Sequence, residues 1–160
     1  MNETLNAIRE AKAAGATTVV NLAPFTALPD TIWPSIDIVI VNETEGRALT
    51  DLPVDTSQAD VLAALEQHPQ LQSKTIVATF GGNGAYSIAQ GQTRHYPAQQ
   101  VEVIDTVGAG DSFCGYLAAT LDQGQSLDEA MRLAVRAGGL ACTIRGAQLS
   151  IPHKSVVNPD

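Results

Sequence analysis

The stretch DTVGAGDSF, residues 105–113, places a glycine turn and a carboxylate at the start of a helical pattern. Residues 101–104 before it are rich in β-branched side chains and predict a strand. The apolar side chains from Phe113 to Leu121 recur at every fourth position, which is the spacing of one helix face. The stretch is therefore predicted to be a turn between the C-terminal end of a strand and a new helix.

The turn has the properties of an anion site. Gly108 and Gly110 permit backbone angles or a close approach that a Cβ would prevent. The first N–H groups of the new helix, with its dipole, favour phosphate or an oxygen that develops negative charge. Asp111 can be a helix-start residue that the dipole stabilises by roughly 0.3–1 kcal/mol. It can also be a general base that accepts the proton of an attacking hydroxyl.

Composition sets broad limits. The 160 residues fit one domain, and 9 basic against 17 acidic residues give a net charge of -8 without a Lys/Arg cluster. That balance argues against a nucleic-acid partner. No apolar run approaches the roughly 18 residues of a membrane span, and the first residues lack a signal-peptide pattern. Cys114 and Cys142 lack metal-ligand spacing and are predicted to be small core residues in a reducing compartment. We expect a cytoplasmic protein.

The rest of the sequence alternates between helix-like and strand-like patterns of apolar residues. Helical patterns cover residues 4–14 and the region from residue 55 to Pro69, and a short helix is predicted between Leu28 and Pro34. Residues 36–41 are an almost unbroken aliphatic run, typical of a central parallel strand covered on both faces. Further strands are predicted at residues 17–22, as a buried strand, and at residues 75–80. This alternation predicts an α/β fold.

Two polar segments follow the predicted strands. Asn42-Glu43-Thr44-Glu45 begins where an open α/β sheet binds ligands, but Asn42 or Thr44 as an N-cap explains the same residues. The glycine-rich residues 81–84 can be a hairpin connection, since Gly and Asn tolerate positive φ.

A last helix is predicted from a capping box at Ser126 and Glu129, with Leu127, Met131, Ala134 and Gly138 facing inward. The small residues 137–139 would allow something to pack closely against this helix.

The pattern Asp-Thr-x-Gly-Ala-Gly-Asp-Ser-Phe resembles the C-terminal signature of the ribokinase-like, or PfkB, carbohydrate kinases. The Asn-x-Ala-Pro and Gly-Ala-Gln segments resemble the ribokinase branch of that family most. The resemblance implies a three-layer αβα fold with a mostly parallel sheet. It also implies that Asp111 is the catalytic base that contacts the sugar, and that the amides of Gly108, Ala109 and Gly110 form the anion hole. No GxxxxGK[ST] loop is present, so backbone donors and metal ions would handle the phosphate charge.

The resemblance implies ATP, Mg²⁺ and K⁺ as ligands. Asn42 and Glu45 match an Asn-x-x-Glu motif in which the Glu helps to hold Mg²⁺ through water. Residues 79–84 match a Thr-x-Gly-x-x-Gly loop along the ATP phosphates, and Val135 matches a position beside the adenine. The implied nucleotide-binding residues are Asn42, Glu45, Thr79, Gly81, Gly82, Asn83, Gly84, Gly110, Asp111 and Val135. The implied K⁺ ligands are the carbonyls of Val107, Ala141, Ile144 and Gly146, the Ser150 hydroxyl and the Asp105 carboxylate.

Members of that family are much longer than this chain. The resemblance implies that residues 1–160 are the C-terminal nucleotide-binding and catalytic part, and that the N-terminal sugar-binding part and lid are absent. The implied activity is ATP-dependent phosphorylation of a sugar hydroxyl, with a nucleotide and a small sugar as partners. Two alternatives follow from the missing half. The chain is a nucleotide-binding remnant or half-domain without kinase activity, or its exposed sheet edge leads to an oligomer or an unstable product.

Overall fold

The computed structural model describes residues 2–158, which divide into two compact units. The first is made of the residues up to Phe80 together with Tyr86–Arg94. The second is made of Gly81–Ala85 together with the residues from His95 onward.

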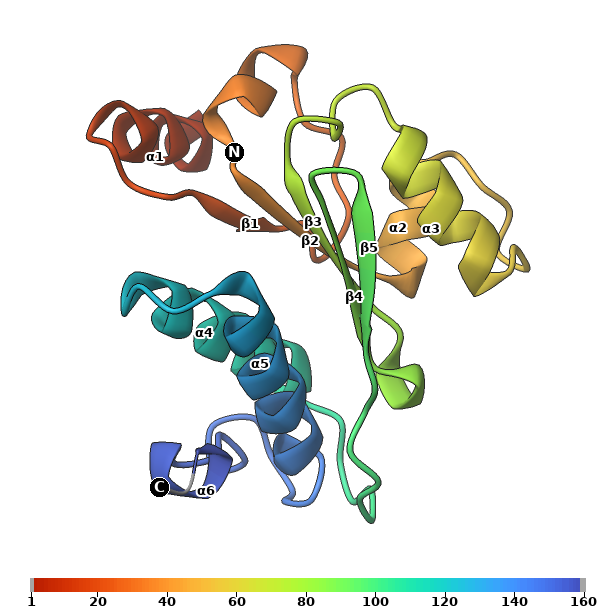
Figure 1. Ribbon diagram of the computed structural model, residues 1–160, viewed down its shortest axis with the longest axis vertical. Coiled ribbons are helices and arrows are strands. Elements are labelled where there is room, and N and C mark those ends of the chain that lie inside the picture. Colours follow the sequence, from red (N-terminus) through yellow and green to blue (C-terminus); the bar gives the residue numbers. More distant parts are fainter. Residues whose placement is uncertain (1, 159–160) are drawn as a thin grey trace. The chain divides into compact units, whose positions relative to one another are not determined.

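The described residues form a five-stranded sheet in the order β1-β2-β3-β4-β5 (Figure 1). β1, β2 and β3 are parallel, with Val19 opposite Ile38 and Ile38 opposite Thr75. Residues 80–84 and 90–91 connect the last three strands and are too short for a parallel crossover, so β4 and β5 continue the sheet as antiparallel hairpins. The bounds are β1 Val19–Asn21, β2 Ile38–Asn42, β3 Thr75–Thr79, β4 Ala85–Ala89 and β5 Gln92–Tyr96.

Helices cover the strands of the first unit. In Figure 1, α1 lies on one side of these strands and α2 and α3 lie on the other. Ile32, Val41 and Leu65 are buried in one apolar cluster with the strands, which explains the aliphatic run that the sequence shows in β2. The elements are α1 Asn2–Ala13, the 3-10 helix η1 Asp30–Ser35, α2 Glu43–Leu49 and α3 Gln58–Gln67. The predicted α/β fold with a mostly parallel sheet is confirmed.

The second unit is built on two helices, α4 and α5, which lie side by side (Figure 1). Phe113 and Leu117 of α4 and Met131 of α5 are buried, as the helical spacing predicts. A Cβ added at Gly138 would lie 3.3 Å from the Ala109 carbonyl oxygen, a tight contact, so the absence of a side chain there favours the close helix crossing. The elements are the 3-10 helix η2 Gly81–Asn83, α4 Ala109–Asp122, α5 Leu127–Ala141 and α6 Lys154–Val157.

The strand predicted at residues 101–104 is wrong. The structure has an irregular extended segment there, and Val103 and Ile104 are more than half exposed. The Ile104 N–H donates to the Cys142 carbonyl at 2.8 Å, next to the end of α5, and not to a neighbouring strand. A β-branched run favours an extended backbone but does not by itself supply the partner strand that makes it part of a sheet.

Three smaller predictions also need correction. The strand at residues 17–22 is shortened to Val19–Asn21 and is half-buried, because β1 lies at the end of the strand order. The short helix expected before Pro34 includes Pro34, in the 3-10 helix η1. Cys114 and Cys142 are only partly buried, so they are not core residues.

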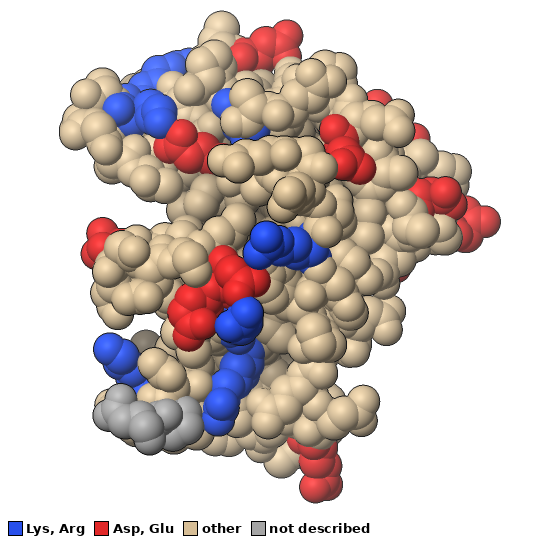
Figure 2. All heavy atoms as spheres, viewed as in Figure 1, with Lys and Arg blue, Asp and Glu red and all other residues tan. Residues whose placement is uncertain are grey.

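The surface of α5 carries both signs of charge. Figure 2 shows acidic and basic side chains next to one another over this helix. Arg132 pairs with Asp128 four residues earlier and lies 3.7 Å from Glu129, and both pairs follow helical spacing. Within residues 2–158, no helix is both long enough and apolar enough to cross a membrane.

Candidate functional site

The turn at residues 105–111 is present, although no strand precedes it. Gly108 is the N-cap of α4 at φ +80° and ψ -2°, a left-handed conformation that favours glycine. Its carbonyl accepts the Ser112 N–H at 2.9 Å, which starts the helix. The Ala109 N–H already donates to the Thr106 carbonyl at 3.3 Å. The N–H groups of Gly110 and Asp111 are the first-turn donors that no earlier turn of the helix can satisfy.

Asp105 fixes this turn to a distant part of the chain. Its carboxylate accepts the Gly146 N–H at 2.9 Å and the Val107 N–H at 3.0 Å. These hydrogen bonds, that from Gly146 above all, lower the pKa of Asp105 below its ordinary value. Next to Gly146, the backbone of Ala147 packs against Gly108, where an added Cβ would lie only 2.9 Å from the Ala147 oxygen. The glycine at position 108 is therefore required twice, by its φ and by this contact.

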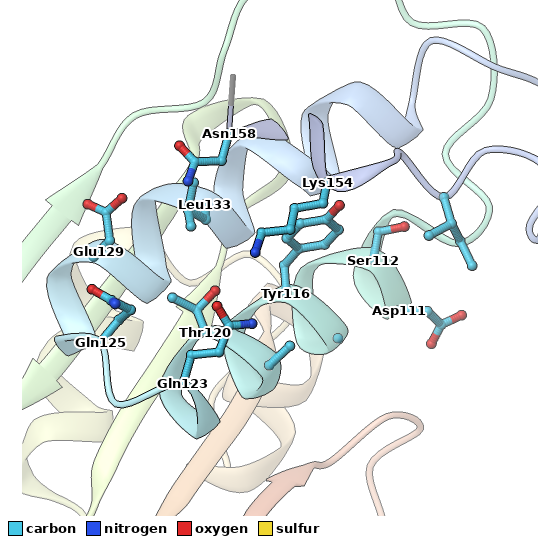
Figure 3. A pocket seen from close by; sticks show the side chains of 13 residues that line it. Asp111, Ser112, Tyr116, Thr120, Gln123, Gln125, Glu129, Leu133, Lys154 and Asn158 are labelled. Atoms are coloured by element: carbon cyan, nitrogen blue, oxygen red, sulfur yellow. The ribbon is translucent and has the colours of Figure 1, made fainter. Parts of the chain in front are cut away.

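Asp111 lies in the first turn of α4 and is exposed. Within the part of the chain that the structure describes, no hydrogen bond or ion pair occupies its carboxylate. It stands at one end of a groove of about 510 Å³ that runs along α4 (Figure 3). A carboxylate that is exposed beside free helix N–H groups can reach a substrate hydroxyl, as a general base must.

Asn42 and Glu45 form a complete capping box at the carboxyl end of β2. Asn42 Oδ1 accepts the Glu45 N–H at 2.9 Å, and Glu45 Oε2 accepts the Asn42 N–H at 2.9 Å. Asn42, and not Thr44, is thus the N-cap. Glu45 is only 7% exposed, while the neighbouring Glu43 pairs with Arg47 at 2.6 Å. The capping interpretation is confirmed, and it leaves Glu45 Oε1 and the Asn42 amide nitrogen for other partners.

The glycine-rich loop has a purely structural explanation for part of its sequence. The Gly84 N–H donates to the Gly81 carbonyl at 2.9 Å, and Gly84 has φ +84°. A Cβ at Gly84 would lie 2.1 Å from the Tyr96 carbonyl oxygen, so no other residue fits there. Gly81 and Gly82, by contrast, face open space. Thr79 contacts β2 through its hydroxyl, 3.5 Å from the Val41 carbonyl.

The residues implied as K⁺ ligands lie in the second unit, and several contact one another. Asp105 joins Val107 and Gly146 through the two hydrogen bonds given above. Ser150 is fully buried, and its hydroxyl donates to the Ala147 carbonyl at 2.9 Å. The Ala141 carbonyl lies 3.5 Å from the Ile144 nitrogen. In residues 2–158, no three side chains of His, Cys, Asp or Glu gather as a metal site, so a cation here would depend mainly on carbonyl and hydroxyl oxygens, with Asp105 as the one carboxylate of the implied set.

The predicted residues are divided between the two units. Asn42, Glu45 and Thr79 belong to the first unit, and the other predicted site residues belong to the second. Val135, on α5, is half-buried.

Sequence reasoning did not identify Ser112 as a special position. Ser112 is 3% exposed, and its hydroxyl makes no hydrogen bond in the described structure. The only indication in the sequence that Ser112 is special was its position directly after Asp111 in the signature.

Comparison with known proteins identifies the family of this chain. A family model described as "pfkB family carbohydrate kinase" matches residues 1–154. The chain belongs to the PfkB family. The ribokinase of Staphylococcus aureus (strain COL) is 36% identical over 155 residues, which are 96% of this chain and 51% of that protein. The ribokinase of Haemophilus influenzae is 37% identical over 144 residues, 90% of this chain and 47% of that protein.

Solved PfkB structures show the same fold. The Arabidopsis thaliana ribokinase complexed with ribose and ATP matches with a TM-score of 0.85 and 27% identity. The match covers 96% of this chain and 50% of that one. The ribokinase of Cryptococcus neoformans in complex with ADP has a TM-score of 0.84 and 29% identity, covering 98% of this chain and 55% of that one. This PfkB chain spans about half the length of the relatives it matches.

Proposed function

We propose that this chain provides the nucleotide-binding and phosphoryl-transfer part of an ATP-dependent sugar kinase. The α4 turn is the observation that carries the proposal, because it combines a free carboxylate with backbone donors at a helix N-terminus. Relatives crystallised with ribose and ATP, or with ADP, make a pentose and an adenine nucleotide the first substrates to test. A cytoplasmic location belongs to the same proposal, since ATP is supplied there.

In the proposed reaction, Asp111 accepts the proton of a sugar hydroxyl. The hydroxyl oxygen forms a bond to the γ-phosphorus of ATP, and the bond from that phosphorus to the β–γ bridging oxygen breaks, so that ADP leaves. The N–H groups of Gly110 and Asp111 stabilise negative charge on the transferred group. Gly108 and Ala109 shape the turn that aims these donors, with the Ala109 N–H added when its 3.3 Å bond to Thr106 opens.

The nucleotide and metal assignments follow the family motif. Asn42, Thr79, Gly81, Gly82, Asn83, Gly84 and Val135 are the proposed nucleotide contacts. Glu45 fits Mg²⁺, because its Oε1 is not needed for the capping box and hard cations prefer carboxylate oxygen and water. Mg²⁺, when bound, supplies charge neutralisation at the phosphates.

The oxygen atoms around Asp105 also fit a monovalent cation. Each Asp105 oxygen accepts one N–H and keeps acceptor capacity, and the buried Ser150 hydroxyl donates to Ala147 while its lone pairs stay available. The carbonyls of Val107, Ala141, Ile144 and Gly146 complete the proposed ligand set.

The second candidate function is nucleotide binding without phosphoryl transfer. The observation that favours it is coverage, because the chain matches only about half of each relative. Calorimetric titration with Mg-ATP, repeated with Asn42→Ala and Glu45→Ala, tests binding. Sugar-dependent ADP release by this chain, reduced on the order of 10²-fold or more by Asp111→Asn, would establish transfer. Binding without ADP release would favour the second candidate, and no binding by the folded chain would refute both.

A further inference from the structure

The last two residues of β5 contact the glycine-rich loop. The first four residues of β5 are exposed, and its last residue, Tyr96, is buried. Nε2 of the exposed His95 lies 2.8 Å from the Asn83 carbonyl oxygen. A carbonyl oxygen can only accept a hydrogen bond, so Nε2 carries the hydrogen and donates it. A histidine ring on β5 therefore holds the end of the 3-10 helix η2.

The other side of the loop rests on the same segment of chain. A Cβ added at Gly84 would lie 2.1 Å from the Tyr96 carbonyl oxygen and 2.7 Å from the Ala98 nitrogen, so the two backbones are in close contact. The Gly84 N–H donates to the Gly81 carbonyl at 2.9 Å and closes the turn. At Gly81 and Gly82, an added Cβ would meet nothing within 4 Å. The loop is thus fixed at its C-terminal end and open at the two glycines proposed above as nucleotide contacts.

Tyr96 also joins this segment to α5, within the second unit. Its hydroxyl donates to Asp128 Oδ1 at 3.2 Å, and Asp128 pairs with Arg132 on the same helix. Asp128 and Val135 are seven residues apart, about two helical turns, so they share one face of α5. Val135 is the position proposed to lie beside the adenine. Adjacent residues of β5 therefore hold the loop and the helix that the proposed function assigns to one nucleotide.

We propose that His95 and Tyr96 are positioning residues for the nucleotide, with His95 fixing η2 and Tyr96 fixing α5. The inference rests on the proposed function, because it takes both elements as nucleotide contacts. Glycine backbones have many accessible conformations, and ordering them on binding costs affinity unless the loop is held in place beforehand. The hydrogen bond from His95 supplies that order. Because the ring is exposed, its removal should change the stability of the whole chain little.

His95→Leu, which removes the donor, is tested by two measurements. Hydrogen exchange followed by mass spectrometry should show faster exchange at residues 81–84 than in the wild type, with a nearly unchanged melting temperature. Calorimetric titration should show Mg-ATP binding weaker by roughly 2- to 10-fold, the effect of one hydrogen bond. His95→Gln places an amide N–H donor at the position of Nε2 and should restore both the slow exchange and the binding.

Two further variants separate the roles. Tyr96→Phe keeps the buried ring and loses the hydroxyl that reaches Asp128. It should weaken Mg-ATP binding without faster exchange at residues 81–84, because its hydrogen bond goes to α5. Thr93→Leu is the matched control, since Thr93 is exposed and lies two residues before His95 on the same face of β5. It should change neither the exchange nor the binding.

The outcomes distinguish this inference from the proposed function. If the wild type binds Mg-ATP, the inference alone is overturned when His95→Leu or Tyr96→Phe binds as tightly, or when the loop of His95→Leu exchanges no faster. Equal losses in His95→Leu and His95→Gln would mean that the ring itself contacts the nucleotide, which also overturns the positioning role. A folded wild-type chain that does not bind Mg-ATP would refute the proposed function, and this inference with it.

Discussion

Replacing Gly108 with alanine should destabilise the second unit and remove nucleotide binding together. Gly108 has φ +80°, and a left-handed conformation costs a non-glycine residue about 1–2 kcal/mol. The added Cβ would also lie 2.9 Å from the oxygen and 3.1 Å from the Cα of Ala147. Those are backbone atoms that the Ser150 and Gly146 hydrogen bonds hold in place, so they cannot move without breaking other contacts.

The cost of the left-handed backbone conformation and the clash with Ala147 together predict a loss of at least about 2 kcal/mol in the free energy of unfolding. For a chain of this size, that corresponds to a decrease of roughly 4–8 °C in melting temperature. Urea unfolding followed by circular dichroism measures the first quantity, and a thermal scan measures the second. Mg-ATP titration of the same variant at a temperature where it is folded should show weaker binding, because the turn would no longer hold the Gly110 and Asp111 N–H groups in place.

Gly110→Ala is the matched comparison. Gly110 lies inside α4, and a Cβ there would meet nothing within 4 Å of the protein. Alanine should therefore stabilise the helix by about 0.5–1 kcal/mol. If the open space is where a phosphate approaches, the same variant should bind Mg-ATP less tightly. The proposed anion site would be supported if Gly108→Ala lowers the stability and Gly110→Ala raises it, while both variants bind Mg-ATP less tightly. A stable Gly108→Ala, or a Gly110→Ala that binds Mg-ATP normally, would refute this reasoning.

Three further predictions concern other residues. Glu45→Ala should cost about 1 kcal/mol of stability through the lost bond to Asn42, while Glu45→Gln keeps an acceptor and should cost less. Calorimetry should nevertheless show weaker Mg-ATP binding for both variants. Normal binding by Glu45→Gln would mean that Glu45 caps the helix and does not hold Mg²⁺. The hydrogen bond from the Gly146 N–H above all lowers the pKa of Asp105, so its contribution to stability is present above the pKa of an ordinary aspartate and is lost as pH falls through the folded-state pKa. Asp105→Asn should therefore be less stable than the wild type in urea at neutral pH, and the difference should disappear in acid; a constant difference would contradict this. Leu65→Ala, at a fully buried position, should cost about 2–5 kcal/mol in urea unfolding, and the half-buried Leu62→Ala should cost less.

The parts of the fold that the sequence predicted well are determined locally. The capping box at Asn42 and Glu45 forms between residues three positions apart. The parallel strand β2 appears as an aliphatic run because helices cover both of its faces. The α4 turn depends on glycine conformations that sequence can encode at single positions. In each case, the residues that decide the structure are neighbours in the chain.

The failed predictions depend on distant partners. Residues 101–104 have strand-like composition, but the Ile104 N–H is satisfied by Cys142, which lies on the far side of α4 and α5 in the sequence. Nothing in the run itself excludes a neighbouring strand. The unpartnered hydroxyl of Ser112 is equally invisible, because a serine at the start of a helix is ordinary and only its 3% exposure without a partner makes it unusual.

The same dependence explains how the proposed anion site is assembled. The signature supplies the donors at Gly110 and Asp111, but Asp105 holds the turn only by accepting the Gly146 N–H, 41 residues away. The Ala147 backbone lies so close to Gly108 that a residue with a Cβ does not fit at this position. A change in residues 144–150 should therefore alter nucleotide binding without contacting the nucleotide. The oxygen atoms proposed to hold a monovalent cation belong to this segment and to Asp105, so such a cation would act on the anion site through the same backbone connection.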